Sequence, residues 1–110
     1  MAEPALAGDP FDALGNPHRR AIVELLASRP RSVREIADEL PISRPAVSRH
    51  LRLLSAAGLV ADEQLGTRRL YRLHEPGVEA VAQYLEQVWG QAAARFRLFA
   101  ENTRPDGSGG

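Results

Sequence analysis

Two short helical patterns separated only by Pro41 and Ile42 constrain the fold of this chain most. The first begins with Ser32 and Glu35, whose spacing is that of a capping box, in which each side chain bonds the backbone N–H of the other residue. Its apolar residues follow at helical spacing: Val33, Ile36, Ala37 and Leu40. A short helix, a tight turn and a second helix predict a helix-turn-helix.

The second pattern, SRPAVSRHLRLL at residues 43–54, has an apolar side and a cationic side. Ser43 is a suitable N-cap, and Pro45 falls in the first turn, where backbone N–H groups have no acceptor inside the helix. The apolar side consists of Val47, Leu51 and Leu54. The outward side consists of Arg44, Pro45, Ser48, Arg49 and Arg52. Gly58 then ends the helix.

The residue pattern of positions 59–73 is typical of β-strands and not of a helix. Short apolar stretches flank Gly66 and Thr67, which predicts two strands joined by a turn. Such short strands are unstable alone, so they must lean on the helices. A hairpin directly after the second helix corresponds to the wing of a winged helix-turn-helix.

Helical patterns also flank this motif on both sides. A short helix in DPFDAL ends at Gly15, and a second begins after the N-cap Asn16 with Pro17 in its first position. A long one follows over residues 76–102. The predicted fold class is mainly α, with about five helices plus a two-stranded wing in one domain over residues 9–100. Composition predicts disorder in residues 1–8 and 101–110.

Charge is segregated along the chain although its formal net charge is zero. Residues 17–72 carry eleven arginines against six acidic residues, between two acidic ends. A basic centre and a helix with a polar outer face favour double-stranded DNA as the partner, because the major groove admits one α-helix. The candidates for reading bases are Arg44, Pro45, Ser48 and Arg49. The candidates for phosphate or wing contacts are Ser43, Arg52, Thr67, Arg68 and Arg69.

Other classes of function lack their sequence signals. The chain has no cysteine, which excludes disulfides and thiolate metal sites. It shows no long apolar run, no secretory signal and no catalytic motif. We therefore expect a cytoplasmic protein that is not an enzyme, with no cofactor and no metal site.

The last helical segment carries an apolar stripe longer than one small domain can cover. Its members are Val78, Val81, Leu85, Val88, Trp89, Ala92 and Phe96, and Phe99 extends it. This length favours contact with a second copy of the chain. A pocket for an apolar effector, lined by Trp89, Phe96 and Phe99, is the alternative, and the two can coexist.

The histidines and several arginines have ordinary structural interpretations. His50 flanks the apolar side of its helix, so we expect a packed, hydrogen-bonded residue instead of a metal ligand. His18 is expected at the surface and His74 in a structural role. A solvated face and a phosphate contact fit equally well for three further residues: Arg19, Arg20 and Arg31.

Three stretches together resemble the ArsR-type winged-helix repressors of bacteria: DALGNPHRRAIVELL, SVREIADELPISRPAVSRHLRLLSAAGLV and GTRRLYRL. The resemblance covers roughly residues 10–100. It implies a homodimer on a palindromic promoter site, often the protein's own. It also implies dimerisation through the first and last helices, which adds Phe11 and Leu14 to the interface candidates.

The metal-sensing pattern of that family is missing here. Where metal sensors carry cysteines, this chain has Glu35-Ile36-Ala37-Asp38, and residues 77–99 contain neither histidine nor aspartate. The resemblance is therefore to the metal-independent, autorepressor-like branch. Two alternatives stay open: an effector-gated sensor with an atypical small-molecule or metal site, and a winged helix used for protein–protein contact.

Overall fold

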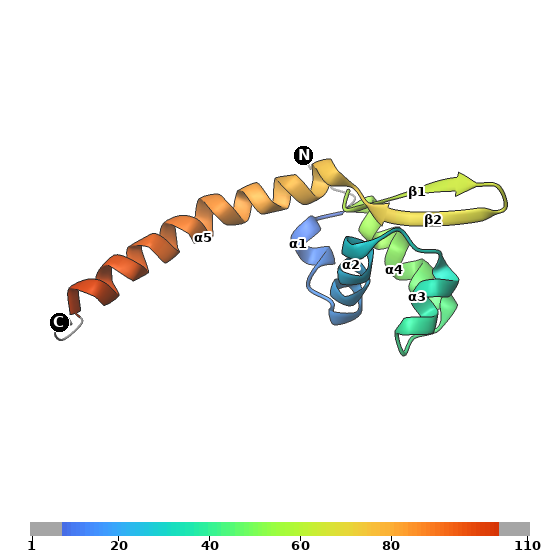
Figure 1. Cartoon of the computed structure of the whole chain (residues 1–110), viewed down its shortest axis with the longest axis horizontal. Coiled ribbons are helices and arrows are strands. Elements are labelled where there is room, and N and C mark those ends of the chain that lie inside the picture. The colour runs from blue at the N-terminus through green and yellow to red at the C-terminus, as the bar shows by residue number, and fades with distance from the viewer. Residues whose placement is uncertain (1–7, 104–110) are drawn as a thin grey trace, which may run out of the picture. The chain divides into compact units, whose positions relative to one another are not determined.

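The computed structural model describes residues 8–103 of the 110-residue chain (Figure 1). The elements follow in the order α1 (Pro10–Ala13), α2 (Pro17–Ser28), α3 (Val33–Glu39), α4 (Arg44–Ala56), β1 (Val60–Leu65), β2 (Arg68–Leu73) and α5 (Glu75–Thr103). This confirms the predicted fold class of five helices and a two-stranded hairpin. Of the two terminal segments predicted to be disordered, residues 1–7 and 104–110 lie outside the described residues, and residues 101–103 instead continue α5.

Side-chain caps begin each of the first four helices. The capping residues are Asp9, Asn16, Ser32 and Ser43, and each accepts a hydrogen bond from a backbone N–H of its helix. The capping box of Ser32 and Glu35 is complete, as predicted. At the other end of α4, Gly58 follows the C-cap Ala57 with φ of +79°, a conformation that favours glycine.

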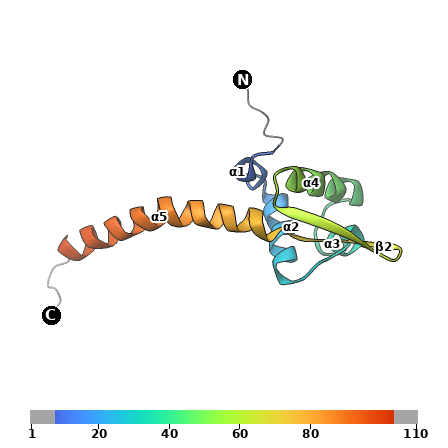
Figure 2. The ribbon, with the colours of Figure 1, turned by 90° about the horizontal axis from the view of Figure 1, so that it is seen from above.

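The chain divides into two compact units, Met1–Glu79 and Ala80–Gly110, with the boundary inside α5. In the first unit, α4 packs against α1, α2, α3 and β1 (Figures 1 and 2). Of the predicted apolar stripes of α3 and α4, Ile36, Val47, Leu51 and Leu54 are buried, whereas Val33, Ala37 and Leu40 are half-buried. The rest of the buried apolar core comes from other positions: Ala13, Ile22, Leu26, Ala57, Leu59 and Val60. Burial of these side chains fixes which side of α4 remains exposed.

The hairpin pairs antiparallel from Val60 opposite Leu73 to Leu65 opposite Arg68. Its two-residue loop begins at Gly66, whose φ is +64°. Arg31 anchors the hairpin through two backbone hydrogen bonds. Its N–H donates to the Tyr71 carbonyl at 2.9 Å, and its carbonyl accepts from the Tyr71 N–H at 2.8 Å. The wing therefore leans on the segment between α2 and α3.

Most of the described α5 belongs to the second unit, where its apolar side chains are largely uncovered. Trp89 is 62% exposed and Phe96 is 71% exposed. The other exposed large apolar residues there are Tyr84, Leu85, Val88, Leu98 and Phe99. No helix within residues 8–103 has both the length and the hydropathy needed to cross a bilayer.

Candidate nucleic-acid interface

The outward side of α4 carries the predicted base-reading residues. Arg44, Pro45 and Arg49 are exposed, and Ser48 is half-buried beside them. Arg52, one turn further along, is also exposed. The capping Ser43 fixes where this helix begins, and the buried stripe of α4 fixes which side faces solvent. The structure thus brings the candidates of α4 to a single solvent-facing side.

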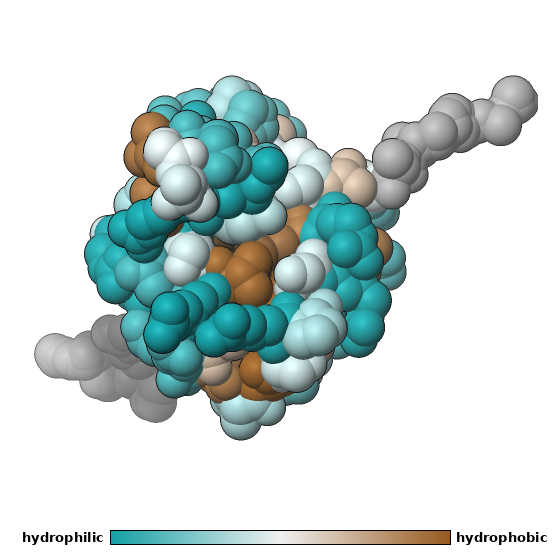
Figure 3. All heavy atoms as spheres, turned by 90° about the vertical axis from the view of Figure 1, so that its right-hand side faces the viewer, coloured by the Kyte–Doolittle hydropathy of each residue, from teal (hydrophilic) through white to brown (hydrophobic). Residues whose placement is uncertain are grey.

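An open groove joins the start of α4 to the wing and to the start of α3. It is lined by Ser32, Val33, Arg34, Arg44, Ser48, Thr67, Arg68, Arg69 and Tyr71. Figure 3 shows the side of the molecule on the right of Figure 1, where hydrophilic residues surround a hollow with hydrophobic residues on its floor. The wing candidates Thr67, Arg68 and Arg69 therefore share one concave surface with Arg44 and Ser48.

The arginines of this surface fall into two classes by their ion pairs. Within the described chain, no carboxylate pairs with the three arginines of α4: Arg44, Arg49 and Arg52. Each wing arginine has a carboxylate partner. Arg68 pairs with Glu35 at 3.4 Å, Arg69 with Asp62, and Arg72 with Glu63 at 3.6 Å. The arginines of α4 can therefore take an anionic ligand without giving up a carboxylate, whereas those of the wing cannot.

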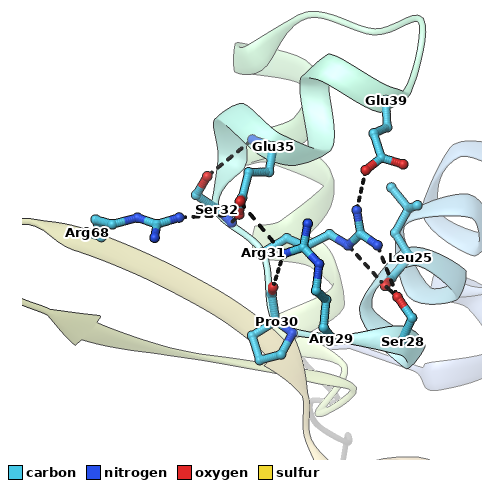
Figure 4. Close-up of polar contacts among 9 residues, drawn as sticks. All are labelled: Leu25, Ser28, Arg29, Pro30, Arg31, Ser32, Glu35, Glu39 and Arg68. Carbon is cyan, nitrogen blue, oxygen red and sulfur yellow. Dashed lines mark hydrogen bonds and ion pairs between the residues drawn. The ribbon is translucent and has the colours of Figure 1, made fainter.

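Glu35 joins the helix cap to the wing (Figure 4). Its Oε1 accepts from the Ser32 N–H at 2.9 Å and lies 3.4 Å from Nη2 of Arg68. Its Oε2 lies 3.7 Å from Nη1 of Arg29. The Ser32 N–H lowers the pKa of Glu35 most, and Arg29 and Arg68 lower it further, against the opposing effect of burial. The carboxylate is thus held in its charged form.

Arg31 is buried, which corrects the expectation that it is either solvated or bound to phosphate. Its guanidinium donates to the Leu25 carbonyl at 3.2 Å, to Ser28 Oγ at 3.0 Å and to Glu39 (Figure 4). These bonds tie the end of α2 to α3. A buried guanidinium needs such partners, so Arg31 holds the fold together and is not available to DNA.

His50 is buried at the edge of the apolar side of α4, as predicted. Its Nδ1 lies 3.4 Å from Nη1 of Arg19, whose Nε also donates to the Ala13 carbonyl at 2.7 Å. Burial lowers the pKa of His50 most, and the charge of Arg19 lowers it further. These contacts give Arg19 a structural role. Arg20 is exposed and donates to the Leu14 carbonyl at 2.8 Å.

The remaining predicted residues are not among those that line the groove. Phe11 on α1 is exposed and Leu14 half-buried, while the α5 candidates range from half-buried to exposed. His18 is exposed, as expected, and His74 is half-buried between β2 and α5. No three histidine, aspartate or glutamate side chains of residues 8–103 gather closely enough to hold a metal ion.

Arg34 is the groove residue that the sequence analysis missed. It lies in the first turn of α3, is exposed, and forms no ion pair with any described carboxylate. Its position opposite the stripe of Ile36 and Leu40 was readable from the helical spacing. Its closeness to the wing was not, because that depends on how the hairpin leans on the helices.

A short helix, a tight turn, a second helix with free arginines on its outer side and a following hairpin define a winged helix-turn-helix DNA-binding protein. The family model described as bacterial regulatory protein, arsR family, matches residues 16–62 of this chain. The HTH-type transcriptional regulator Rv2034 of Mycobacterium tuberculosis is 43% identical over 96 residues, which cover 87% of this chain and 90% of that protein. This chain belongs to the ArsR family.

Two further comparisons agree. The HTH-type transcriptional repressor SmtB of M. tuberculosis is 46% identical over 67 residues, which cover 61% of this chain and half of that protein. A crystal structure described as a possible transcriptional regulator for arsenical resistance has 37% identity and a TM-score of 0.67, covering 74% of this chain and 84% of that one. The chain is thus a DNA-binding transcriptional regulator and not an enzyme, which confirms both predictions.

Proposed function

We propose that this protein is a homodimeric repressor that binds a palindromic promoter site in the cytoplasm, with its own promoter among the targets. The observation that carries the proposal is the outward side of α4, where three exposed arginines have no carboxylate partner within the described chain. A repressor role also agrees with the name of the relative SmtB.

The residues of the groove divide between base reading and phosphate binding. We assign base-edge contacts to Arg44, Ser48 and Arg49, with Pro45 beside them, because all four lie in the first turns of α4. Arginine reads guanine through two parallel hydrogen bonds. The phosphate contacts are assigned to Ser43, Arg52, Thr67, Arg68 and Arg69, and we add Arg34.

The uncovered apolar side of α5 supports a dimer. Phe96 and Trp89 are mostly exposed, and exposed apolar surface of this extent marks an interaction site. A second α5 offers a matching apolar face. We assign Phe11 and Leu14 of α1 to the same interface. A symmetric dimer presents two copies of α4, so its site has two half-sites with inverted sequence.

We further propose that repression works without a thiolate metal site, because the sequence contains no cysteine. The segment Glu35–Asp38 supplies carboxylates, and one of them, Glu35, is engaged by Ser32, Arg29 and Arg68. Any signal that releases this protein from DNA must therefore act through other chemistry.

Selection of bound sequences from random duplex DNA tests the proposal directly. We expect an inverted repeat whose half-sites are about 10–10.5 base pairs apart, the spacing of successive major grooves on one side of the duplex. Enrichment of a single half-site would contradict the dimer. Enrichment of no motif, with affinity staying in the non-specific range, would contradict sequence-specific binding and favour a protein partner.

A further inference from the structure

The wing arginine Arg68 is held by a carboxylate of the helix-turn-helix itself. Figure 4 shows its guanidinium directed at Glu35 of α3. Arg68 lines the same groove as Arg44. Arg44 has no such partner among residues 8–103. Two arginines of one groove therefore differ in what they must give up to bind an anion.

We propose that Glu35 is a positioning residue that holds Arg68 against α3 in the free protein and competes with DNA phosphate for its guanidinium. The inference rests on the proposed function, in which Arg68 contacts a phosphate. It assigns to Glu35 a role in setting affinity and salt dependence that neither its place in the cap nor the family requires.

The geometry suits an exchange of partners. Arg68 is 58% exposed and touches Glu35 through a single contact of 3.4 Å, so its long side chain can turn outward. Glu35 keeps the Ser32 N–H at 2.9 Å and Arg29 at 3.7 Å when Arg68 leaves. The carboxylate therefore always keeps polar partners, so the exchange changes the free energy of the protein only slightly.

Counterion release makes the competition measurable. A free arginine that binds a DNA phosphate releases about one condensed cation, which contributes about one to the slope of log affinity against log salt. When Arg68 leaves Glu35, the vacated carboxylate attracts cations again. The net release is smaller, so Arg68 contributes less to the slope than Arg52 does, since Arg52 is a phosphate candidate with no ion pair to a described carboxylate.

Glu35→Gln is a sharp test, because glutamine also completes a capping box while carrying no charge. We expect this variant to bind a selected duplex and a random duplex more tightly by a similar factor, about two- to five-fold, the range of exposed ion pairs. We also expect a steeper salt slope. Asp38→Asn is the matched control, since it removes the same charge from α3 at an exposed residue with no ion pair to a described residue. It should change affinity much less.

The Arg68→Gln background identifies the route of the effect. Glu35→Gln should raise affinity little in that background, and a full increase there would overturn the competition through Arg68. In the otherwise native protein, Arg68→Gln should lower the salt slope by less than Arg52→Gln. This comparison leaves the capping box intact, so it decides the matter even if Glu35→Gln unfolds.

These experiments distinguish a failure of the proposed function from a failure of the competition between Glu35 and DNA phosphate. If the native protein binds no duplex, the proposed function fails and this inference with it. If the native protein binds while Glu35→Gln, shown to be folded by circular dichroism, leaves affinity and slope unchanged, only the inference fails.

Discussion

Nη1 of Arg19 lies 3.4 Å from Nδ1 of His50, so that α2 donates to a buried ring on α4. A guanidinium can only donate, so Nδ1 must accept, and the proton of the neutral ring resides on Nε2. The centroid of the His50 ring lies 5.8 Å from that of the His18 ring. The positive charge of Arg49 also lowers the pKa of His50. The contact between α2 and α4 therefore includes a hydrogen bond that the uncharged ring of His50 accepts.

The free energy of unfolding should fall as the pH drops below about 6.5, the ordinary pKa of histidine. Burial first, then Arg19, Arg49 and His18, hold the pKa of His50 below that value in the folded state. The unfolded chain then binds more protons than the folded one, so stability rises with pH in this window and levels off below the folded pKa. The slope from one group is at most about 1.4 kcal/mol per pH unit.

Urea unfolding between pH 5.5 and 7.5 measures this slope, and His50→Gln serves as the control. Glutamine offers an oxygen to Arg19 but does not titrate. The variant should show a flatter dependence on pH, whatever its absolute stability. Equal slopes in the two proteins would mean that His50 does not carry the effect.

The backbone of Gly77 in α5 approaches that of Gly58 so closely that the helix leaves no room for a side chain at Gly77. A Cβ at Gly77 would lie 1.7 Å from the carbonyl oxygen of Gly58, a backbone atom. We therefore expect Gly77→Ala to destabilise the protein by about 1–3 kcal/mol or more, as overpacking does. Urea unfolding at fixed protein concentration measures the difference.

Gly90→Ala is the matched control on the same helix. Its Cβ would meet only the flexible Glu86 side chain, at 3.4 Å. Alanine is favoured over glycine inside a helix by up to about 1 kcal/mol, so this change should be neutral or stabilising. Destabilisation of similar size by both substitutions would show that the close contact at Gly58 is not the cause.

Local features of this fold were predictable from the sequence, and contacts between distant residues were not. Asn16, Ser32 and Ser43 cap their helices because capping depends on a few neighbouring residues. The stripe of Val47, Leu51 and Leu54 follows from helical period alone. These local rules are sufficient to predict which side of α4 faces outward.

The polar partners depend instead on tertiary packing. Nothing in the spacing of Arg31 indicates that it is buried, since this follows from the bridge to Tyr71 and the position of Glu39. The pairing of Arg68 with Glu35 joins residues far apart in the chain, and it exists only because the wing leans over α3. Charge patterning predicted a basic surface but could not tell which arginines are already paired.

Phe96→Glu should convert the protein to a monomer. Phe96 is 71% exposed in the apolar stripe of α5, and a carboxylate there would have to be buried unpaired in a dimer interface. Sedimentation velocity measures the change in mass. The affinity for DNA should also fall, because a monomer contacts only one half-site.

Ala94→Glu is the control for added charge on α5. Ala94 is exposed and lies two residues before Phe96, which places it on the opposite face of the helix. This variant should remain dimeric. A Phe96→Glu protein that sediments as a dimer would remove α5 from the proposed interface.

Arg49→Ala should relax the choice of base at one position of each half-site. Arg49 is exposed on α4 and unpaired within the described chain, so its two-pronged donor is available to a guanine. Losing such a contact costs about 1–3 kcal/mol of discrimination against the wrong base. Titrations with operators substituted one base pair at a time measure it.

Arg52→Ala is the matched control, because it removes the same charge from the same helix. It separates the recognition of bases from the general attraction to DNA phosphates. Arg52 lies nearly one turn after Arg49, beyond the turns that reach base edges, so its proposed contact is a phosphate. Its loss should weaken all duplexes by a similar factor and reduce the salt slope by about one. If both variants weaken every duplex alike, Arg49 binds phosphate too, and sequence reading falls to Arg44 and Ser48.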